Sequence, residues 1–398
     1  MQGRRDEELM AAAMELAKRG KGRTRPNPLV GAILARDGRV LGSGWHERCG
    51  GPHAEIRAIE DAYARGASSL AGATMYVTLE PCCHYGRTPP CADRLIAEGI
   101  AEVAVGMRDP NPLVAGGGLA RLEAAGVRIT EGMLTEQCRE LNRAFIKHIR
   151  TGLPFMTLKM ALSADGKTAS PSGASKWISS EASRRDVHAL RMESAAVLVG
   201  IGTVLADDPE LSCRELPHGP ATAETPQPVR IVADSALRTP PGARVLAREG
   251  AIIVGVQTAD PAVARRAAVL EAAGARVVFA PPEPPDGLDG RYDAPDAPAS
   301  RAARVDLRWL AAWLGGQGIN SVLLEGGAGL AAAALRAGVV DRVRFYYAPL
   351  IMGGRTAPGP VGGDGAACPD AGLKLEGARW ERIGPDMVME ADVCSPEL

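Results

Sequence analysis

The sequence lacks the charge excess and the long apolar segments that would point to nucleic acid or to a membrane. Its 46 Lys and Arg residues almost balance 47 Asp and Glu residues, and no basic stripe is present, so nucleic acid is not an expected partner. The N-terminal stretch MQGRRDEELM has no apolar region of a secretory signal. The apolar stretch AAVLVGIGTVLA has 12 residues, too few to span a bilayer. These absences predict a cytoplasmic protein with no membrane partner.

Cysteines are also few. Eight of them in 398 residues do not form the disulfide framework of a small secreted protein. Three of the eight, however, fall close together at Cys82, Cys83 and Cys91. In a chain without a visible secretory signal, such a cluster indicates metal binding or catalysis.

The length and the pattern predict two α/β domains. A chain of 398 residues is too long for one simple core. Helical and strand patterns alternate in both halves, which indicates helices packed on a sheet. A helix is expected from about 135 to 150, and Gly152 and Pro154 interrupt the pattern after it. We therefore place the domains at 1–150 and 151–398.

The second half contains seven expected strands. They are FMTLKMAL, AVLVGI, VRIVAD, AIIVGV, RVVFA, SVLLEG and RVRFYYAP, and the last of them covers 342–349. No internal repeat relates the two halves, so they are expected to be different domains.

Four residues of the first half have the types and the order of a catalytic zinc site. Zinc takes nitrogen and sulfur ligands, and a catalytic site keeps one position for water. His53 and Cys91 each begin an expected helix, and Cys82 follows an expected strand. A thiolate is favoured at a helix N-terminus. Glu55 is placed to face the water without binding the metal, an arrangement typical of zinc-dependent nucleobase deaminases.

Other interpretations of these residues are open. A His-x-Glu at a helix start is usually a cap with surface charge, and a pair of cysteines is usually buried packing. An iron–sulfur cluster usually has four thiolate ligands, whereas this group offers three cysteines and a histidine, so a cluster is the poorer interpretation. The usual deaminase signature is Pro-Cys-x-x-Cys, whereas eight residues separate Cys82 from Cys91 here, and Cys83 is a rival thiolate. The ordered combination nevertheless favours a metal site.

Longer motifs extend the comparison to nearly the whole chain. TLEPCCHYGRTPPC, RPNPLVGA, GWH, GGPHAE and DPNPLVAGGG in the first half resemble the bifunctional riboflavin-biosynthesis deaminase/reductase family. In the second half LKMALSADGKTA, SKWIS, RRDVHALR, GIGTVLADDPELSCR and LLEGGAGLAAA resemble the reductase domain of that family. The resemblance implies a cytidine-deaminase-like α/β/α sandwich followed by a dihydrofolate-reductase-like α/β domain. It is weakest after about residue 355.

For the first domain, the resemblance implies one zinc ion per chain, bound by His53, Cys82 and Cys91, with Glu55 as the proton carrier. It leaves Cys83 as a bystander. It further implies that the pyrimidine substrate is contacted by Asn27, which would otherwise be interpreted as a turn residue, and by His84.

For the second domain, elementary chemistry gives partial support. The strand, glycine turn and helix start in EGGAGLAAA expose backbone N–H groups to a phosphate, although this is not the G-x-G-x-x-G fingerprint. Two arginines in one pocket suit a sugar phosphate. Lys159 and Asp165 are candidates for moving protons. The resemblance implies NADPH contacts at Ala161, Trp177, Thr203, Asp207, Ser235 and Gly327. It implies substrate contacts at Ser175, Arg191, Leu211, Arg214 and Glu325.

The activity implied by the resemblance has two steps. The first is zinc-dependent hydrolytic deamination of 2,5-diamino-6-ribosylamino-4(3H)-pyrimidinone 5′-phosphate. The second is NADPH-dependent reduction of the ribosyl group to ribityl, giving 5-amino-6-ribitylamino-uracil 5′-phosphate. The family also implies a homo-oligomer. Three alternatives remain: a nucleic-acid deaminase, which predicts a basic surface; a zinc-stabilised protein that senses a nucleotide without catalysis; and a chain with one inactive half.

Overall fold

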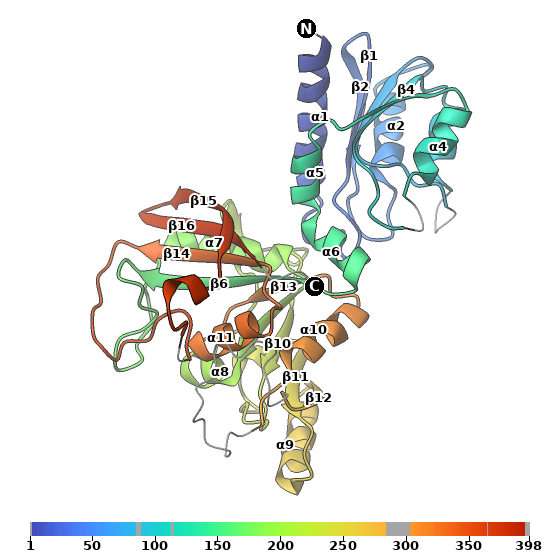
Figure 1. Ribbon diagram of the computed structural model, residues 1–398. Helices are drawn as coiled ribbons and strands as arrows, with labels where there is room; N and C mark the ends of the chain where they lie inside the picture. Colours follow the sequence, from blue (N-terminus) through green and yellow to red (C-terminus); the bar gives the residue numbers. More distant parts are fainter. Residues whose placement is uncertain (1, 85–88, 113–114, 284–302, 364, 395–398) are drawn as a thin grey trace. The chain divides into compact units, whose positions relative to one another are not determined.

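The computed structural model describes residues 2–84, 89–112, 115–283, 303–363 and 365–394. The chain divides into two compact units, Met1–Gly152 and Leu153–Leu398, which Figure 1 shows in blue to green and in green to red. Each unit has its own sheet and its own hydrophobic core. None of the helices in the described ranges is long and apolar enough to cross a membrane.

The first unit is built on a five-stranded sheet of order β2-β1-β3-β4-β5. β1 is antiparallel to both neighbours, whereas β3, β4 and β5 are parallel to one another. The strands are β1 (Gly31–Arg36), β2 (Arg39–Trp45), β3 (Thr74–Leu79), β4 (Glu102–Met107) and β5 (Arg128–Glu131).

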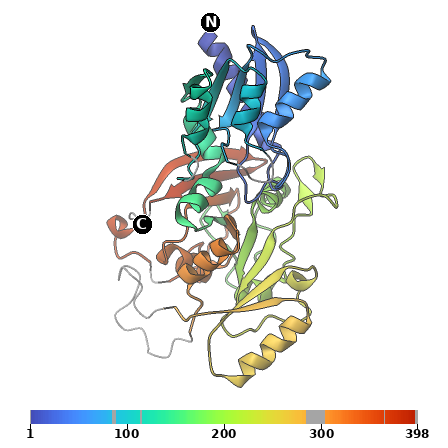
Figure 2. The same ribbon diagram turned by 90° about the vertical axis from the view of Figure 1, so that its right-hand side faces the viewer.

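Helices cover both faces of this sheet (Figure 2). They are α1 (Gln2–Lys18), α2 (Ala54–Ala64), α3 (Cys91–Ala97), α4 (Gly117–Ala124), α5 (Thr135–Leu141) and α6 (Arg143–Thr151). Leu34 of β1 packs in the core with α2, α3 and α4, whereas its neighbour Ile33 packs with α1, as the alternation of side chains along a strand requires. A Cβ on Gly31 would lie 1.9 Å from the Ala13 carbonyl oxygen, so this glycine permits close packing of α1. The α/β/α sandwich is confirmed.

The helix expected from about 135 to 150 is interrupted, which corrects that prediction. α5 ends at Leu141 and α6 begins at Arg143, and between them Asn142 leaves the helical conformation with φ −111°. The Asn142 amide exchanges two hydrogen bonds with the backbone of Leu29, at 2.8 and 3.0 Å. This contact with a distant segment replaces continuous helix geometry, because Asn readily bonds to backbone groups.

The second unit contains a nine-stranded sheet of order β12-β11-β10-β7-β13-β6-β14-β16-β15. Neighbours from β12 to β14 are parallel, and the last two pairings are antiparallel. The strands are β6 (Phe155–Ser163), β7 (Ala196–Gly200), β10 (Val229–Ala233), β11 (Ala251–Val256), β12 (Arg276–Ala280), β13 (Ser321–Leu324), β14 (Arg342–Ala348), β15 (Leu375–Ile383) and β16 (Asp386–Val393). A short hairpin joins β8 (Glu215–Leu216) and β9 (Gly219–Pro220).

Successive residues of the parallel strands point to opposite cores. Leu198 of β7 packs with α10 and α11, whereas Val199 packs with α9. The helices are α7 (Glu181–Glu193), α8 (Ile201–Asp207), α9 (Pro261–Ala272), α10 (Leu307–Gly316) and α11 (Ala328–Arg336), with the short 3₁₀ turns η1 (Arg244–Leu246) and η2 (Pro369–Ala371). In such a sheet, ligands bind at the carboxyl ends of the strands, and the loops that follow β7, β10 and β13 line the cavity described below.

Candidate active sites

Three side chains of the first unit converge as a metal-binding group. The ligand atoms of His53, Cys82 and Cys91 lie within 4.8 Å of one another. His53 is the N-cap residue of α2, yet its side chain makes no capping hydrogen bond. Cys82 follows β3, and Cys91 is the first residue of α3. Interpreting His53 as an ordinary helix cap is therefore wrong.

The spacing of these atoms fits a tetrahedral zinc ion. His53 Nδ1 lies 3.3 Å from Cys91 Sγ and 3.6 Å from Cys82 Sγ. With Zn–N and Zn–S bonds of ordinary length, two ligands of a tetrahedral site are about 3.5 Å apart. One nitrogen and two sulfur donors also match the ligand types that zinc prefers.

The two cysteines differ in acidity. Hydrogen bonds from the Cys91 thiol, His53 and the Cys91 backbone N–H stabilise the Cys82 thiolate and lower its pKa below its usual range. The adjacent Cys82 sulfur and burial raise the pKa of Cys91 well above its usual range. Two adjacent thiolates repel each other, so a bound divalent cation is what would allow both to ionise.

Glu55 lies beside this group in the first turn of α2 and is 3% exposed. Burial raises the pKa of its carboxyl to about 6, against the opposing effect of His53. A carboxylate with a pKa near the working pH both accepts and returns protons efficiently. Glu55 is thus buried next to the ligands without belonging to the ligand group.

Asn27 and His84, the residues expected to contact the pyrimidine, differ in burial. Asn27 is half-buried, and its Nδ2 lies 3.1 Å from His46 Nε2. His84 is exposed and directly precedes residues outside the described ranges. Cys83 is not part of the metal-binding group. A Cβ on Gly117 would lie 2.8 Å from its sulfur, so Cys83 packs against the start of α4.

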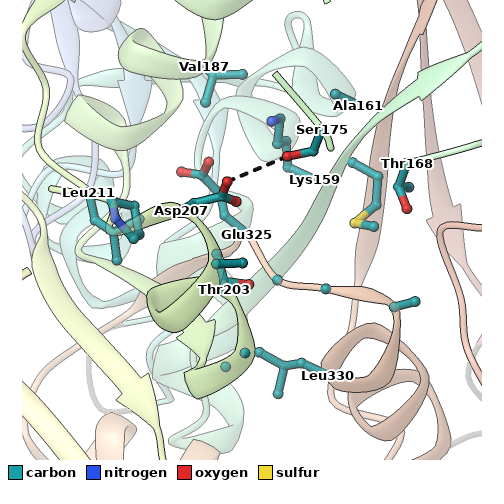
Figure 3. A pocket seen from close by; sticks show the side chains of 18 of the residues that line it. Lys159, Ala161, Thr168, Ser175, Val187, Thr203, Asp207, Leu211, Glu325 and Leu330 are labelled. Atoms are coloured by element: carbon teal, nitrogen blue, oxygen red, sulfur yellow. Dashed lines mark hydrogen bonds between the residues drawn. The ribbon is translucent and has the colours of Figure 1, made fainter. Parts of the chain in front are cut away.

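The second unit contains a cavity of about 1210 Å³, shown in part in Figure 3. All eleven residues expected to contact NADPH or the reductase substrate line it. Its polar centre is the pair of Arg191 and Glu325, joined by two hydrogen bonds of 2.6 and 2.9 Å. Arg191 is only 13% exposed, so it is not an ordinary solvated arginine. Lys159 also lines the cavity, and burial lowers the pKa of its amine.

Further polar groups lie around this pair. Ser175 donates to Asp207 at 3.5 Å (Figure 3). Asp207 is the last residue of α8, and Asp208 is its C-cap residue. Gly327 is the N-cap of α11 and lines the cavity, and the first N–H groups of a helix are suited to binding phosphate. Trp177 is 70% exposed, with the Arg184 guanidinium 4.6 Å from its ring centre.

Comparisons with known proteins match both units. The family model described as the RibD C-terminal domain matches residues 154–389. The model of the cytidine and deoxycytidylate deaminase zinc-binding region matches residues 3–107. The riboflavin biosynthesis protein RibD of Actinobacillus pleuropneumoniae is 42% identical over 393 residues, 98% of this chain and 96% of its own length. The chain belongs to the RibD family.

Solved structures of RibD proteins share the whole fold. Acinetobacter baumannii RibD has a TM-score of 0.83 at 35% identity, covering 99% of this chain and 100% of that one. A diaminohydroxyphosphoribosylaminopyrimidine deaminase/5-amino-6-(5-phosphoribosylamino)uracil reductase from Thermotoga maritima has a TM-score of 0.78 at 33% identity, with the same coverage. Escherichia coli RibD is 41% identical over 358 residues, 87% of this chain and 89% of its own length.

As a RibD protein, the chain is a bifunctional enzyme of riboflavin biosynthesis, a hydrolytic deaminase and an oxidoreductase. Its deaminase unit binds zinc, and its reductase unit uses NADPH. The two-domain α/β fold expected from the sequence is confirmed.

Two buried side chains of the deaminase unit were missed by the sequence reasoning. His46 is 3% exposed, and its Nδ1 lies 3.1 Å from the Pro52 carbonyl oxygen. Because a carbonyl only accepts, Nδ1 carries the proton, and Nε2 accepts from the Asn27 amide. Glu80 accepts from the backbone N–H groups of Asp109, Gly116 and Gly118, at 3.2, 3.0 and 3.1 Å. In the sequence, the motif GWH could have indicated His46, and the motif DPNPLVAGGG, which supplies the N–H donors, could have indicated Glu80.

The reductase unit adds one missed residue and one correction. His188 lines the cavity, and burial lowers the pKa of its imidazole to about 4, assisted by Arg191 and Arg214. Asp165, a candidate for moving protons, is not among the residues that line the cavity. Its carboxylate instead accepts hydrogen bonds from Ser163 Oγ and from two backbone N–H groups of the segment after β14, so it is engaged in holding a loop.

Proposed function

We propose that the deaminase unit acts on 2,5-diamino-6-ribosylamino-4(3H)-pyrimidinone 5′-phosphate at ring carbon 2, and that the reductase unit then converts the ribosyl group to ribityl. The product is 5-amino-6-ribitylamino-uracil 5′-phosphate. The observation that carries the proposal is the buried carboxylate of Glu55 beside one nitrogen and two sulfur ligand atoms within 4.8 Å of one another. The printed name of the Thermotoga maritima protein supports this substrate class. The functional domains are 1–150 and 151–398.

In the deaminase step, His53, Cys82 and Cys91 hold the metal, and Asn27 and His84 orient the pyrimidine. Zinc, when bound, makes a water molecule acidic enough to lose a proton near neutral pH. Glu55, with a pKa of about 6, is ionised at pH 7 and takes that proton. The oxygen adds to ring carbon 2, and Glu55 passes the proton to the ring nitrogen. Glu55 then takes the second proton from the added hydroxyl and gives it to the amino group, which leaves as ammonia as the carbonyl forms. The net reaction is hydrolysis.

In the reductase step, the cavity holds cofactor and sugar in contact. NADPH, when bound, supplies the hydride to carbon 1 of the ring-opened ribose. The cofactor contacts are Ala161, Trp177, Thr203, Asp207, Ser235 and Gly327, and the substrate contacts are Ser175, Arg191, Leu211, Arg214 and Glu325. Ring opening leaves carbon 1 doubly bonded to the amino nitrogen. Lys159, which lies in the cavity and whose pKa burial lowers, is the proposed source of the proton that this nitrogen takes up when carbon 1 receives the hydride.

The test is an assay of the full chain with zinc, NADPH and the diaminopyrimidine substrate, in which ammonia release and NADPH loss are followed separately. Both signals are expected, with ammonia first. Release of ammonia without NADPH loss would identify an inactive second half. Absence of both signals would favour a nucleotide-sensing protein, and ammonia from single-stranded nucleic acid alone would favour a nucleic-acid deaminase.

The proposal includes a cytoplasmic location and a homo-oligomeric state. None of the eight cysteines forms a disulfide, which fits a reducing compartment. Cell fractionation and sedimentation equilibrium of the purified chain test these two statements.

A further inference from the structure

A buried segment outside the regular structure carries two of the expected substrate contacts of the reductase. Leu211, labelled in Figure 3, and Arg214 both line the cavity. The segment lies between α8 and β8 and belongs to no helix or strand. Leu211, Ser212 and Cys213 are 2%, 1% and 2% exposed. Buried backbone N–H and C=O groups need hydrogen-bond partners, so groups outside the sheets must provide them here.

The Gln227 side chain satisfies both backbone groups of Cys213. Its Oε1 accepts from the Cys213 N–H at 2.8 Å, and its Nε2 donates to the Cys213 carbonyl oxygen at 2.9 Å. A side-chain amide offers a donor and an acceptor on one planar group, so it reproduces the pair of bonds that an adjacent strand would make. Gln227 lies two residues before β10. We name this contact the Gln227 clamp, since it ties the segment to the nine-stranded sheet.

Two other side chains reach the same segment but fix it less completely. His188 Nδ1 lies 3.1 Å from the Ser212 carbonyl oxygen and 3.3 Å from the Arg214 N–H, but one ring nitrogen cannot donate and accept at once. Arg191 Nη1 donates to the Ser212 carbonyl at 3.2 Å. Both side chains line the cavity, whereas Gln227 is not among the described residues that do. The clamp therefore does not compete with a bound ligand.

Leu211 adopts a backbone conformation that needs such support. Its φ is +56°, in the left-handed region that is unfavourable for a residue with a side chain. Such conformations persist only where the surrounding structure fixes them. Without the clamp, the backbone around Cys213 would be free to relax. Relaxation would turn Leu211 and Arg214, which flank Cys213, away from their positions in the cavity.

We propose that Gln227 is a positioning residue of the reductase, which holds Leu211 and Arg214 in the conformation that contacts the substrate. The proposal rests on the substrate contacts included in the proposed function, and it adds a residue outside the cavity that determines their geometry. A segment that is already ordered loses little freedom when the substrate binds. The clamp therefore acts on substrate affinity and leaves hydride transfer in the bound complex unchanged.

The test measures steady-state reduction of already deaminated substrate by the full chain with NADPH. Gln227→Met keeps the length of the side chain and removes both hydrogen bonds to Cys213, so KM for the substrate is expected to rise about tenfold. The kcat and the Kd of NADPH should stay at their wild-type values. Gln317→Met is the matched control, because Gln317 is also exposed and accepts a hydrogen bond from Arg276. It should behave like the wild type.

A second variant guards against a folding defect. Gln227→Glu keeps the acceptor for the Cys213 N–H but sets a carboxylate oxygen against the Cys213 carbonyl, so it should also raise KM. Titration with NADPH verifies that each variant is folded. In an Arg214→Ala background, Gln227→Met should raise KM by a clearly smaller factor, because part of what the clamp positions has been removed.

The outcomes separate this proposal from the proposed function. A wild type that does not reduce the substrate would contradict both together. A wild type that reduces it, with an unchanged KM in Gln227→Met, would contradict the role of Gln227 alone. A fall in kcat at constant KM, or an equal rise in KM with and without Arg214, would also rule out positioning through this segment.

Discussion

Glu55 and its neighbours show how burial assigns chemical roles to single residues. The carboxylate is almost fully removed from water, and this raises its pKa to about 6. Two residues earlier, His53 presents Nδ1 to two sulfur atoms. Spacing in the sequence suggested a proton carrier at Glu55 and a metal ligand at His53. Only the fold shows that neither side chain is an ordinary helix-terminal group.

Glu55→Gln is expected to retain zinc and to lose deamination by a factor of about 10² or more, the usual contribution of a general acid–base group. The amide cannot accept the proton from water. Ammonia release and metal content should be measured together. Reduction of substrate that is already deaminated is the internal control and should be unchanged. Near-normal ammonia release by the variant would show that Glu55 is not the proton carrier.

His46 illustrates a role that spacing did not reveal. Its partners are the Asn27 amide, 19 positions earlier, and the Pro52 carbonyl. Together these contacts fix which end of the Asn27 amide is available for the proposed contact with the substrate. Sequence reasoning could not find this because the hydrogen-bond direction depends on three segments meeting in space.

We expect His46→Phe to lower kcat/KM for deamination by about tenfold, the value of one oriented hydrogen bond, with zinc content preserved. In an Asn27→Ala background the same change should have little further effect, because the two residues act as a unit. Steady-state kinetics of the wild type, the two single variants and the double variant form a double-mutant cycle. Additive losses would mean that His46 acts independently of Asn27.

At the scale of elements, the sequence predicted the interior well and the periphery poorly. The strand expected before Cys82 is β3, and the helix expected to begin at His53 has the bounds Ala54–Ala64. These elements bury one face or both faces, so their apolar periodicity is strong. β15 and β16 were absent from the seven strands expected in the second half. β15 buries no face, so charged and apolar residues mix along it without alternation.

Helix α7 carries a buried histidine, His188, whose contact is sensitive to pH. His188 lies beneath the segment after α8, with Nδ1 3.1 Å from the Ser212 carbonyl oxygen and 3.3 Å from the Arg214 N–H. Its folded pKa of about 4 is below its ordinary value of 6.5. Between these two values the unfolded chain binds the additional proton, so stability falls as pH decreases from 6.5 toward 4.

Replacing His188 with Gln is expected to remove this component of the pH dependence. Urea unfolding of the wild type and the variant at several pH values from about 4.5 to 7 provides the measurement. The slope of the unfolding free energy against pH should be smaller in the variant. The difference should correspond to the uptake of at most one proton on unfolding. Equal slopes in the two proteins would place the acid sensitivity elsewhere.

At the scale of the whole molecule, the chain consists of two units with separate cores. Their independence was expected from the interruption at Gly152 and Pro154. Composition and spacing alone did not identify the reductase cavity, and the eleven expected contact residues that line it came from family resemblance. The cavity gathers loops from many strands, and such long-range proximity leaves no periodic signal in a single sequence.

A fragment of residues 153–398 is expected to fold and to bind NADPH with the affinity of the full chain, because the residues lining the cavity all belong to that unit. Fluorescence titration with NADPH measures binding, and circular dichroism verifies folding. A folded fragment that does not bind NADPH would show that the cavity requires the first unit.

The three metal-ligating side chains come from segments that are separated by 29 and 9 positions along the chain, and they meet only when β3, α2 and α3 have packed. The unfolded chain therefore presents no such site, and zinc acts as a ligand of the native state alone. Bound zinc is consequently expected to stabilise the folded first unit through mass action.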